Sequence, residues 1–242
     1  MNNDERWSVY IDIEGFGALY PKEDTILLAL GDLMEGIYLA GCNFFPQSPD
    51  RIFAHQTGDG FIIVGEFGSP MLETPVALAI ALLRHVVRRG RFAKAAIAEG
   101  TLAGINGCYP QIIQDAQAGT GRDVFMGDGL LTVFPVMGTA LINAISIEKR
   151  SPSGALLTVA ARDVGRLPIG CIWRLTDDEN VASIDWVHSD FQMIYSIQSS
   201  ADLSAPSTQD LVAAFASYFK SAELPMKWKI MTNEYLSLGL LQ

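Results

Sequence analysis

The sequence predicts an α+β fold, and three features of its order lead to that conclusion. β-branched and aromatic runs alternate with segments of helical apolar spacing as strand, helix, strand, strand, helix, strand. An Asp-Gly pair between the second and third runs is typical of a hairpin, and the pattern changes beyond Gly165. This order is the split βαβ arrangement. We therefore expect a ferredoxin-like βαββαβ core over residues 1–165, with a C-terminal α/β extension over residues 166–242 packed on it.

The elements of the first half follow from local patterns. Trp7 to Ile13 is a short β-branched and aromatic run, which predicts a buried strand. Glu23 to Leu39 repeats apolar residues at helical spacing, and Gly41 is the expected end of this helix. Arg51 to Phe67 contains two short strands separated by the sequence Thr-Gly-Asp-Gly, which predicts a hairpin.

The later elements are predicted in the same way. Leu72 to Arg89 reads as a second helix closed by Gly90, and a strand begins at Phe92. We expect a loop over residues 104–122, a helix in the second half of residues 130–147 and a strand over residues 155–159. The extension is expected to contain strands near residues 171–175 and 183–188 and a helix over residues 209–221.

Composition excludes several classes of function. The chain has 242 residues, 49% of them hydrophobic, and a formal charge of −10. Because duplex binding depends on Lys and Arg neutralising phosphates, we expect no nucleic-acid partner. Cys42, Cys108 and Cys171 are scattered, which favours reduced thiols over disulfides or a zinc site. We expect no signal peptide and no membrane span, the apolar stretch from Pro75 to Val87 being too short, and hence a cytoplasmic protein.

Two carboxylates at matching turns are the strongest indication of chemistry. Asp12 ends the first strand and Asp59 lies at the tip of the hairpin, so both would meet at one end of the sheet. Magnesium takes few protein ligands and completes its coordination with phosphate oxygens, which suits two carboxylates and a triphosphate. The glycine-containing turn after Asp12 would offer backbone N–H groups to those phosphates.

These residues resemble a known family. Tyr10-Ile-Asp12-Ile-Glu-Gly15-Phe16 is similar to the first metal motif of class III adenylate and guanylate cyclases, and Thr57-Gly-Asp59-Gly-Phe resembles the second. The segments Ala96–Gly100 and Gly138–Ile147 resemble two further motifs of that family, in the expected order over residues 7–160.

The resemblance implies a cyclase fold and a set of site residues. It implies that Asp12, Ile13 and Asp59 bind two divalent ions, Mg or Mn, and that Ile13, Gly15 and Phe16 contact a nucleoside triphosphate. It also implies a homodimer with shared active sites, in which Asn143 of one subunit serves the site of the other. The family has an Arg four residues after that Asn, where this chain has Ile147; Arg150, one helical turn further, is our candidate replacement.

The base-reading positions match neither purine code of the family. His55 stands where adenylate enzymes have Lys and guanylate enzymes have Glu, and the second position lies near Phe134. Phe53 and His55 share a strand face, and with Phe134 they would narrow the pocket towards a pyrimidine. The chain resembles the short bacterial pyrimidine cyclases of antiphage defence (the Pycsar type), which favours UTP over CTP and a second-messenger role.

Three alternatives stay open from the sequence. The chain is a purine cyclase, or it is a degenerate cyclase-like module that binds a nucleotide or a protein without catalysis, for which Ile147 is the main support. The third is another ferredoxin-like phosphotransferase, although the Gly-Gly-Asp-Glu-Phe hairpin of diguanylate cyclases is absent.

Overall fold

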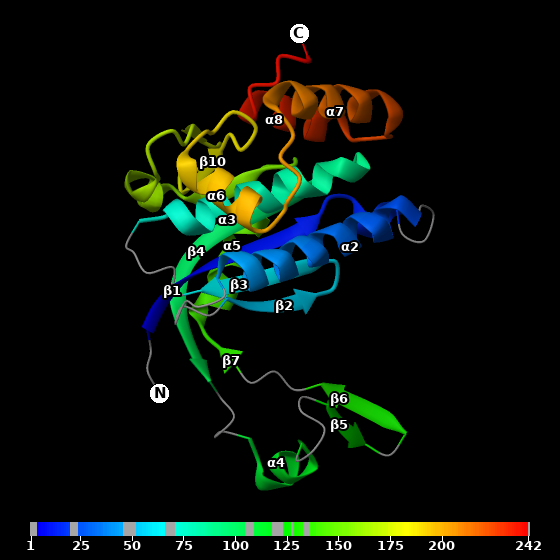
Figure 1. Cartoon of the computed structure of the whole chain (residues 1–242), viewed down its shortest axis with the longest axis vertical. Helices are drawn as coiled ribbons and strands as arrows, with labels where there is room; N and C mark the ends of the chain where they lie inside the picture. The colour runs from blue at the N-terminus through cyan, green and yellow to red at the C-terminus, as the bar shows by residue number, and fades with distance from the viewer. Residues whose placement is uncertain are drawn as a thin grey trace.

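One mixed sheet organises the chain (Figure 1), and a computed structural model describes residues 4–19, 24–45, 52–65, 71–104, 109–117, 123–126, 128–132 and 136–241. Its strands lie in the spatial order β2-β3-β1-β4-β8-β10-β9, and β7 pairs with the far end of β4. The bounds are β1 Asp4–Ile13, β2 Phe53–Thr57, β3 Gly60–Gly65, β4 Ala93–Gly104, β7 Val136–Met137, β8 Leu157–Ala160, β9 Trp173–Leu175 and β10 Val181–Ile184.

The first four main strands form the predicted core. β1 is antiparallel to both β3 and β4, and β3 is antiparallel to β2. The helices α2 (Asp24–Leu39) and α3 (Glu73–Val86) connect β1 to β2 and β3 to β4. The order β2-β3-β1-β4 with these two connections is the expected βαββαβ fold, so the predicted fold class is confirmed.

The two faces of β1 have different partners because side chains alternate along a strand. Trp7, Val9, Ile11 and Ile13 belong to the main hydrophobic cluster, together with buried residues of α2 and α3. The opposite face packs against α5 (Thr139–Arg150), where the Ser8 hydroxyl donates to the carbonyl of Ala140 at 2.6 Å. The residues of β1 on this second face, up to and including Asp12, therefore lie under α5.

One helix end and one loop differ from the sequence-based expectation. The expected end at Gly41 is wrong, because the chain continues from α2 into a π-helical turn, Ala40–Phe44. The second helix ends as predicted: α3 continues into a 3₁₀ turn, Val87–Arg89, and Gly90 has a left-handed φ of 65°. Within the predicted loop at 104–122 the structure has a helix, α4 (Gln111–Gln117).

The segment Asp24–Phe44 is long and apolar enough to cross a membrane by length and composition, which the sequence analysis overlooked. Ile26, Ala29, Leu33 and Ile37 on this helix are buried in the main cluster. These contacts are those of a helix covering a sheet.

The chain beyond residue 160 joins the same sheet and the same cluster. It comprises the 3₁₀ helix Ala161–Arg166, the strands β9 and β10, and the helices α6 Gln192–Ser200, α7 Thr208–Ser221 and α8 Met226–Tyr235. Trp186 is fully buried, and its indole N–H donates to the carbonyl of Ala155 at 2.8 Å. The boundary expected at residue 165 stays a prediction.

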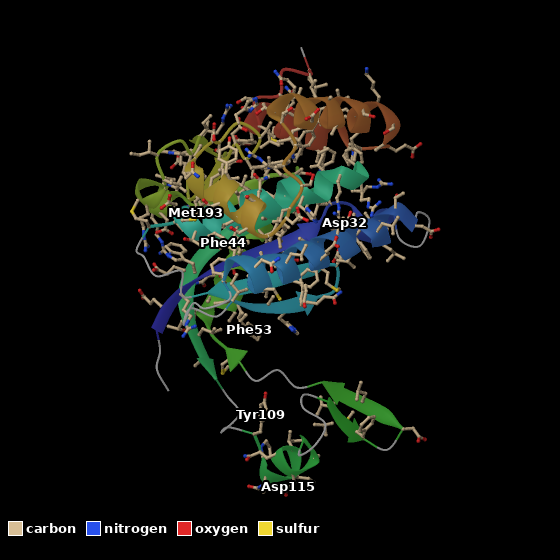
Figure 2. All side chains as sticks on the ribbon, viewed as in Figure 1. Asp32, Phe44, Phe53, Tyr109, Asp115 and Met193 are labelled. Atoms are coloured by element: carbon tan, nitrogen blue, oxygen red, sulfur yellow. The ribbon has the colours of Figure 1, made fainter. Side chains whose placement is uncertain are left out.

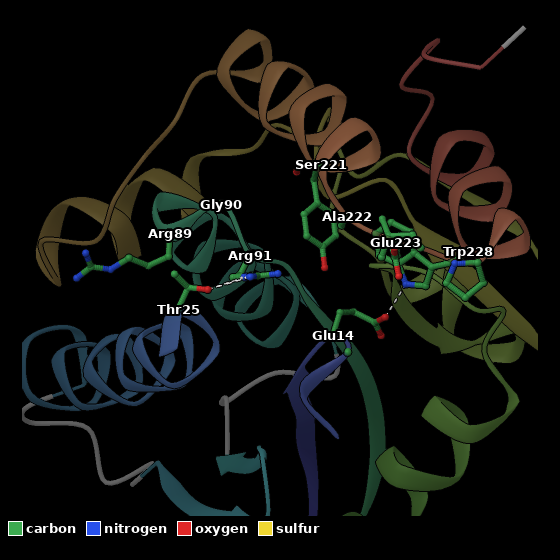
Figure 3. A pocket seen from close by; sticks show the side chains of 13 residues that line it. Glu14, Thr25, Arg89, Gly90, Arg91, Ser221, Ala222, Glu223 and Trp228 are labelled. Carbon is green, nitrogen blue, oxygen red and sulfur yellow. Dashed lines mark hydrogen bonds between the residues drawn. The ribbon is translucent and has the colours of Figure 1, made fainter. Parts of the chain in front are cut away.

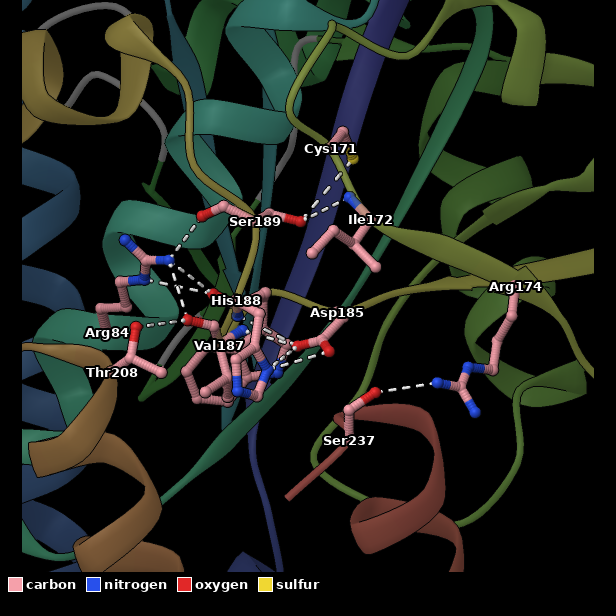
Figure 4. A network of polar contacts seen from close by, with 11 residues as sticks. Arg84, Cys171, Ile172, Arg174, Asp185, Val187, His188, Ser189, Thr208 and Ser237 are labelled. Atoms are coloured by element: carbon pink, nitrogen blue, oxygen red, sulfur yellow. Dashed lines mark hydrogen bonds and ion pairs between the residues drawn. The ribbon is translucent and has the colours of Figure 1, made fainter. Parts of the chain in front are cut away.

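Arg84 of α3 fastens this second part to the first (Figure 4). It is buried, and its guanidinium donates to the carbonyls of Trp186, Val187 and Ser189 at 2.8–3.3 Å. Asp185 accepts from the backbone N–H of His188 and lies 3.0 Å from its ring Nδ1. The polar run after Trp186 thus forms a turn that packs the extension on α3.

A short arm projects from the far end of β4 (Figures 1 and 2). It carries the helix α4 and a hairpin of β5 (Asp123–Met126) and β6 (Gly129–Thr132). Asp115 of α4 lies at its extremity in Figure 2. The arm is remote from the end of β1 that carries the candidate site.

Candidate active site

The end of β1 places Asp12 in a row with residues of both neighbouring strands. Asp12 is paired with Gly60 of β3 and with Lys94 of β4. Directly opposed residues in a sheet point to the same face, so Asp12 and Lys94 share the face that α5 covers. The Lys94 ammonium lies 4.0 Å from Asp12 Oδ2.

The hairpin brings Asp59 to this row, as the sequence predicted. The two central residues of its loop are Gly58, with a φ of 67°, and Asp59, since Thr57 and Gly60 close the ladder. Glycine at the first central position is typical of two-residue hairpin loops. A Cβ on Gly60 would come within 2.8 Å of Asp12 Cβ, so only glycine lets the hairpin approach this closely.

Three carboxylates gather around Lys94. Its ammonium contacts Glu148 of α5 and lies 3.6 Å from Glu14 Oε1, in addition to Asp12. Burial alone would lower the pKa of Lys94, but Asp12, Glu14 and Glu148 raise it, so the side chain stays charged. Lys94, Glu14 and Glu148 are site residues that the sequence analysis missed. The one clue in the sequence was the position of Lys94, two residues before the Ala96–Gly100 motif.

The Asp12 carboxyl group is the least satisfied group of the site. It is 8% exposed; Oδ2 accepts from the Tyr10 hydroxyl at 3.2 Å, whereas Oδ1 is buried with no hydrogen-bond partner among the described residues. Burial raises the pKa of Asp12 from 3.8 to about 7, with Lys94 opposing and the carboxylates of Glu148, Glu14 and Asp59 adding to the rise. Oδ1 is therefore the oxygen of this carboxyl group that could accept a cation.

The Ile13 carbonyl points towards the same place. The N–H of Glu14 donates to the carbonyl of Phe92, on the β4 side, at 2.9 Å. A trans peptide is planar with its C=O opposite its N–H, so the Ile13 carbonyl is directed to the β3 side, where the hairpin tip lies. The ladder with β3 ends at Asp12 and Gly60, which leaves this carbonyl beyond the last rung.

The donor set fits a divalent cation. No group of three or more His, Cys, Asp or Glu side chains arranged for a metal ion occurs in the described part of the chain. Magnesium, however, binds through one or two carboxylates and completes its shell with water and phosphate oxygens. Asp12, Asp59 and the Ile13 carbonyl form such an incomplete set, and the orphaned Oδ1 of Asp12 is its clearest sign.

The loop that follows contributes Gly15 and Phe16. Gly15 has a φ of 75°, and Phe16 opens the single helical turn α1 (Phe16–Leu19). Glu14 and Gly15 line a cavity of about 860 Å³ whose far wall is the turn between α7 and α8 (Figure 3). One side of this loop therefore borders open space.

The expected base-reading residues share the face of Asp12. On the edge strand β2, Phe53 is paired with Val64 and His55 with Ile62. Ile62 is in turn paired with Tyr10 of β1, which hydrogen-bonds Asp12. The third expected residue, Phe134, lies outside the described residues.

The two residues expected to stabilise the transition state have partners in their own chain. The Asn143 amide donates to the carbonyl of Glu99 at 2.8 Å. Glu99 is five residues along β4 from Lys94, about 17 Å at the rise of an extended strand. Arg150, exposed at the end of α5, makes a two-point ion pair with Asp178 at 2.8 and 2.9 Å. Neither residue therefore joins Asp12 within one subunit.

No protein-family model and no curated protein sequence matches the chain. Among solved structures it is similar to a monomeric, doubly mutated guanylyl cyclase domain of the RhoGC fusion protein from the aquatic fungus Blastocladiella emersonii, with 10% identity, a TM-score of 0.44, and 75% of this chain and 93% of that chain covered. A bacterial light-regulated adenylyl cyclase is similar at 8% identity and a TM-score of 0.43, over 82% of this chain and 56% of that one. At these values the likeness carries no conclusion about activity.

Proposed function

We propose that this chain is a nucleotidyl cyclase that converts a nucleoside triphosphate to a 3′,5′-cyclic monophosphate and pyrophosphate. The observation that carries the proposal is the meeting of Asp12 and Asp59 at one end of the sheet, with Asp12 Oδ1 buried and unpartnered. A buried carboxylate oxygen that has no hydrogen-bond or cation partner is costly to stability. Cation binding by the Asp12 carboxylate would account for this cost, and it therefore supports the proposal.

The reaction joins the 3′ oxygen to the α-phosphorus and breaks the bond from that phosphorus to the oxygen bridging to the β-phosphate. The hydroxyl proton is released, and pyrophosphate leaves with the bridging oxygen. Two divalent ions, when bound, would favour ionisation of the hydroxyl and neutralise the leaving group. Asp12, Asp59 and the Ile13 carbonyl would hold them.

The other side chains of the site have complementary tasks. Lys94 supplies a fixed ammonium beside Asp12, which would contact a phosphate oxygen of the metal-bound triphosphate. Glu148 and Glu14 hold that ammonium in place. The N–H groups at Gly15 and Phe16 would approach phosphate oxygens from the loop after β1.

A homodimer would complete the site. The Asn143 amide donates to the carbonyl of Glu99, which lies about 17 Å along β4 from Lys94, so this amide is directed away from Asp12 of its own subunit. Packing two copies with their sites facing would bring Asn143 of one against the nucleotide of the other. Arg150 would join it only after exchanging Asp178 for the substrate.

The proposed base is a pyrimidine, UTP in preference to CTP. Support comes from Phe53 and His55, which lie in cross-strand pairs on the face that carries Asp12. Aromatic and imidazole side chains there would narrow the space for a purine. A pyrimidine product would fit a second messenger of antiphage defence, produced in the cytoplasm.

The test is an incubation of the purified protein with Mn²⁺ and each of ATP, GTP, CTP and UTP, with products separated by mass. We expect cyclic UMP from the wild type and none from Asp12→Asn or Asp59→Asn. A cyclic purine product would keep the cyclase and refute the pyrimidine assignment. Turnover that persists in both variants would refute the metal ligands.

A second candidate function is a cyclase-like module that binds a nucleotide without turning it over. Two observations favour it: Ile147 occupies the family Arg position, and Arg150 is engaged with Asp178. A folded protein that binds Mn²⁺ and a triphosphate but forms no cyclic product from any nucleotide would establish this module in place of the enzyme.

A further inference from the structure

One side chain of the C-terminal extension reaches the candidate site. The indole N–H of Trp228, on α8, donates to Glu14 Oε2 at 2.5 Å, across 214 positions of sequence. Glu14 is two residues from Asp12 and next to Ile13, the two first-strand residues assigned to the cation. The extension thus contacts the residue that directly follows the two proposed ligands of β1 (Figure 3).

Trp228 is held rigidly by aromatic neighbours. It is 4% exposed, and its ring meets those of Tyr218 and Phe219 of α7 edge to face, with centroids 5.9 and 6.1 Å apart. One turn earlier on α7, Phe215 stacks on Phe92 at 3.9 Å. Phe92 is also the residue whose carbonyl accepts from Glu14 N–H. The donor of the Glu14 bond is therefore fixed relative to the strand beside Glu14.

Glu14 is in consequence restrained at three points. Its N–H is bonded to Phe92, its Oε2 to Trp228, and its Oε1 lies 3.6 Å from the Lys94 ammonium. Because the peptide unit is planar, restraining Glu14 N–H also restrains the direction of the Ile13 carbonyl. The same side chain helps to hold Lys94 4.0 Å from Asp12 Oδ2.

The cavity of about 860 Å³ makes the Trp228 contact significant. It lies between the β1–α1 loop, represented by Glu14 and Gly15, and the α7–α8 turn, represented by Leu224 and Pro225. On this side the loop has open space in place of packed side chains. Without the Trp228 bond, Glu14 would face that space and exchange its protein donor for water.

We propose that Trp228 is a positioning residue that acts through Glu14 to orient the Ile13 carbonyl and the Lys94 ammonium at the end of β1, so that the C-terminal extension sets the affinity of the site for divalent cations. This inference rests on the proposed function and concerns the same site. Residues that orient metal ligands without binding the metal themselves typically change metal affinity 10–100-fold when they are mutated.

The test measures Mn²⁺ binding to the full chain by titration calorimetry, with no nucleotide present. Trp228→Phe keeps most of the aromatic packing and removes the N–H donor, and we expect the dissociation constant for Mn²⁺ to rise about tenfold. The matched control is Trp173→Phe on the exposed strand β9, which should bind as the wild type does. Thermal melting in EDTA shows whether each variant is folded.

Glu14→Ala provides the second arm, because it leaves α8 intact. We expect it to weaken Mn²⁺ binding to a similar degree, and we expect Trp228→Phe to cause no further loss in the Glu14→Ala background. Additive losses, or an unchanged dissociation constant in a folded Trp228→Phe, would overturn the inference while leaving the cation site standing. A wild type that binds no Mn²⁺ would overturn the proposed cation site and this inference with it.

Discussion

Asp12 gives the candidate site a pH-dependent stability that can be measured without substrate. Burial raises the pKa of Asp12 from 3.8 to about 7. Between these values the unfolded chain has lost the proton and the folded chain keeps it, so the free energy of unfolding falls as the pH rises through this window. The contribution is fully present below 3.8 and is lost above 7. From pH 5.5 to pH 8 the loss amounts to about 2 kcal/mol, at 1.36 kcal/mol per pKa unit.

The assay is equilibrium urea unfolding in EDTA at pH 5.5 and pH 8. We expect the wild type to be about 2 kcal/mol less stable at the higher pH through this group, and Asp12→Asn to lack that decrement because an amide does not titrate. For a chain of this size the difference corresponds to about 4–8 °C in Tm. Asp115→Asn, on the exposed arm helix, is the control and should follow the wild type.

The effect of divalent cations on stability provides a second, independent test of the role of Asp12. A ligand that binds only the folded state raises its stability by mass action. Adding Mn²⁺ at pH 8 should therefore restore stability to the wild type and leave Asp12→Asn unchanged. If Asp12→Asn kept the full decrement between pH 5.5 and pH 8, the assignment of the effect to the buried Asp12 carboxyl group would be refuted.

Three further substitutions test other parts of the structure. Gly60→Ala would place a Cβ 2.8 Å from Asp12 Cβ, and we expect at least a tenfold loss of Mn²⁺ affinity by calorimetry; an unchanged affinity would contradict the close approach. Arg84→Met removes the donor to three carbonyls of the turn before α6 and should cost about 3 kcal/mol in urea unfolding, whereas the exposed Arg162→Met should cost under about 0.5 kcal/mol. Ile147→Arg introduces the residue that class III cyclases have at the position that Ile147 resembles, and on the proposed function it should raise kcat for cyclic UMP formation at least tenfold, since cationic groups at developing phosphate charge are large electrostatic contributors; a lower kcat would show that this position does not face the substrate.

The local pattern of the sequence was sufficient for the fold of the core. The β-branched run at the first strand and the helical spacing of Glu73–Val86 decide structure through their own neighbours, which sequence reveals. The placement of Asp12 and Asp59 at one end of the sheet also followed from topology, because a hairpin tip and a strand end meet wherever the two strands are adjacent.

The rest of the site depended on contacts between distant residues. Trp228 and Glu14 are separated by 214 positions, and no periodicity relates them. Lys94 looks like an ordinary strand residue until the register of β4 against β1 is known. Helix α8 was missed because one of its three buried positions is the polar Thr232, which breaks the helical spacing of apolar residues. The end of α2 was misjudged because Gly41 stops a helix only where no further packing holds the chain.

Under the proposed function, the charge of the site would require the cations to bind before or together with the substrate. Asp12, Asp59, Glu14 and Glu148 bring four carboxylates to one end of the sheet, and Lys94 is the ammonium among them. The chain as a whole carries a formal charge of −10. A free triphosphate would meet strong repulsion there, whereas divalent ions on Asp12 and Asp59 would reverse the local sign. The acidic excess thus makes the metal–nucleotide complex the form that this site would accept. The Trp228 contact matters for the same reason, since a shift of the Glu14 carboxylate would change the electrostatic potential at those ions.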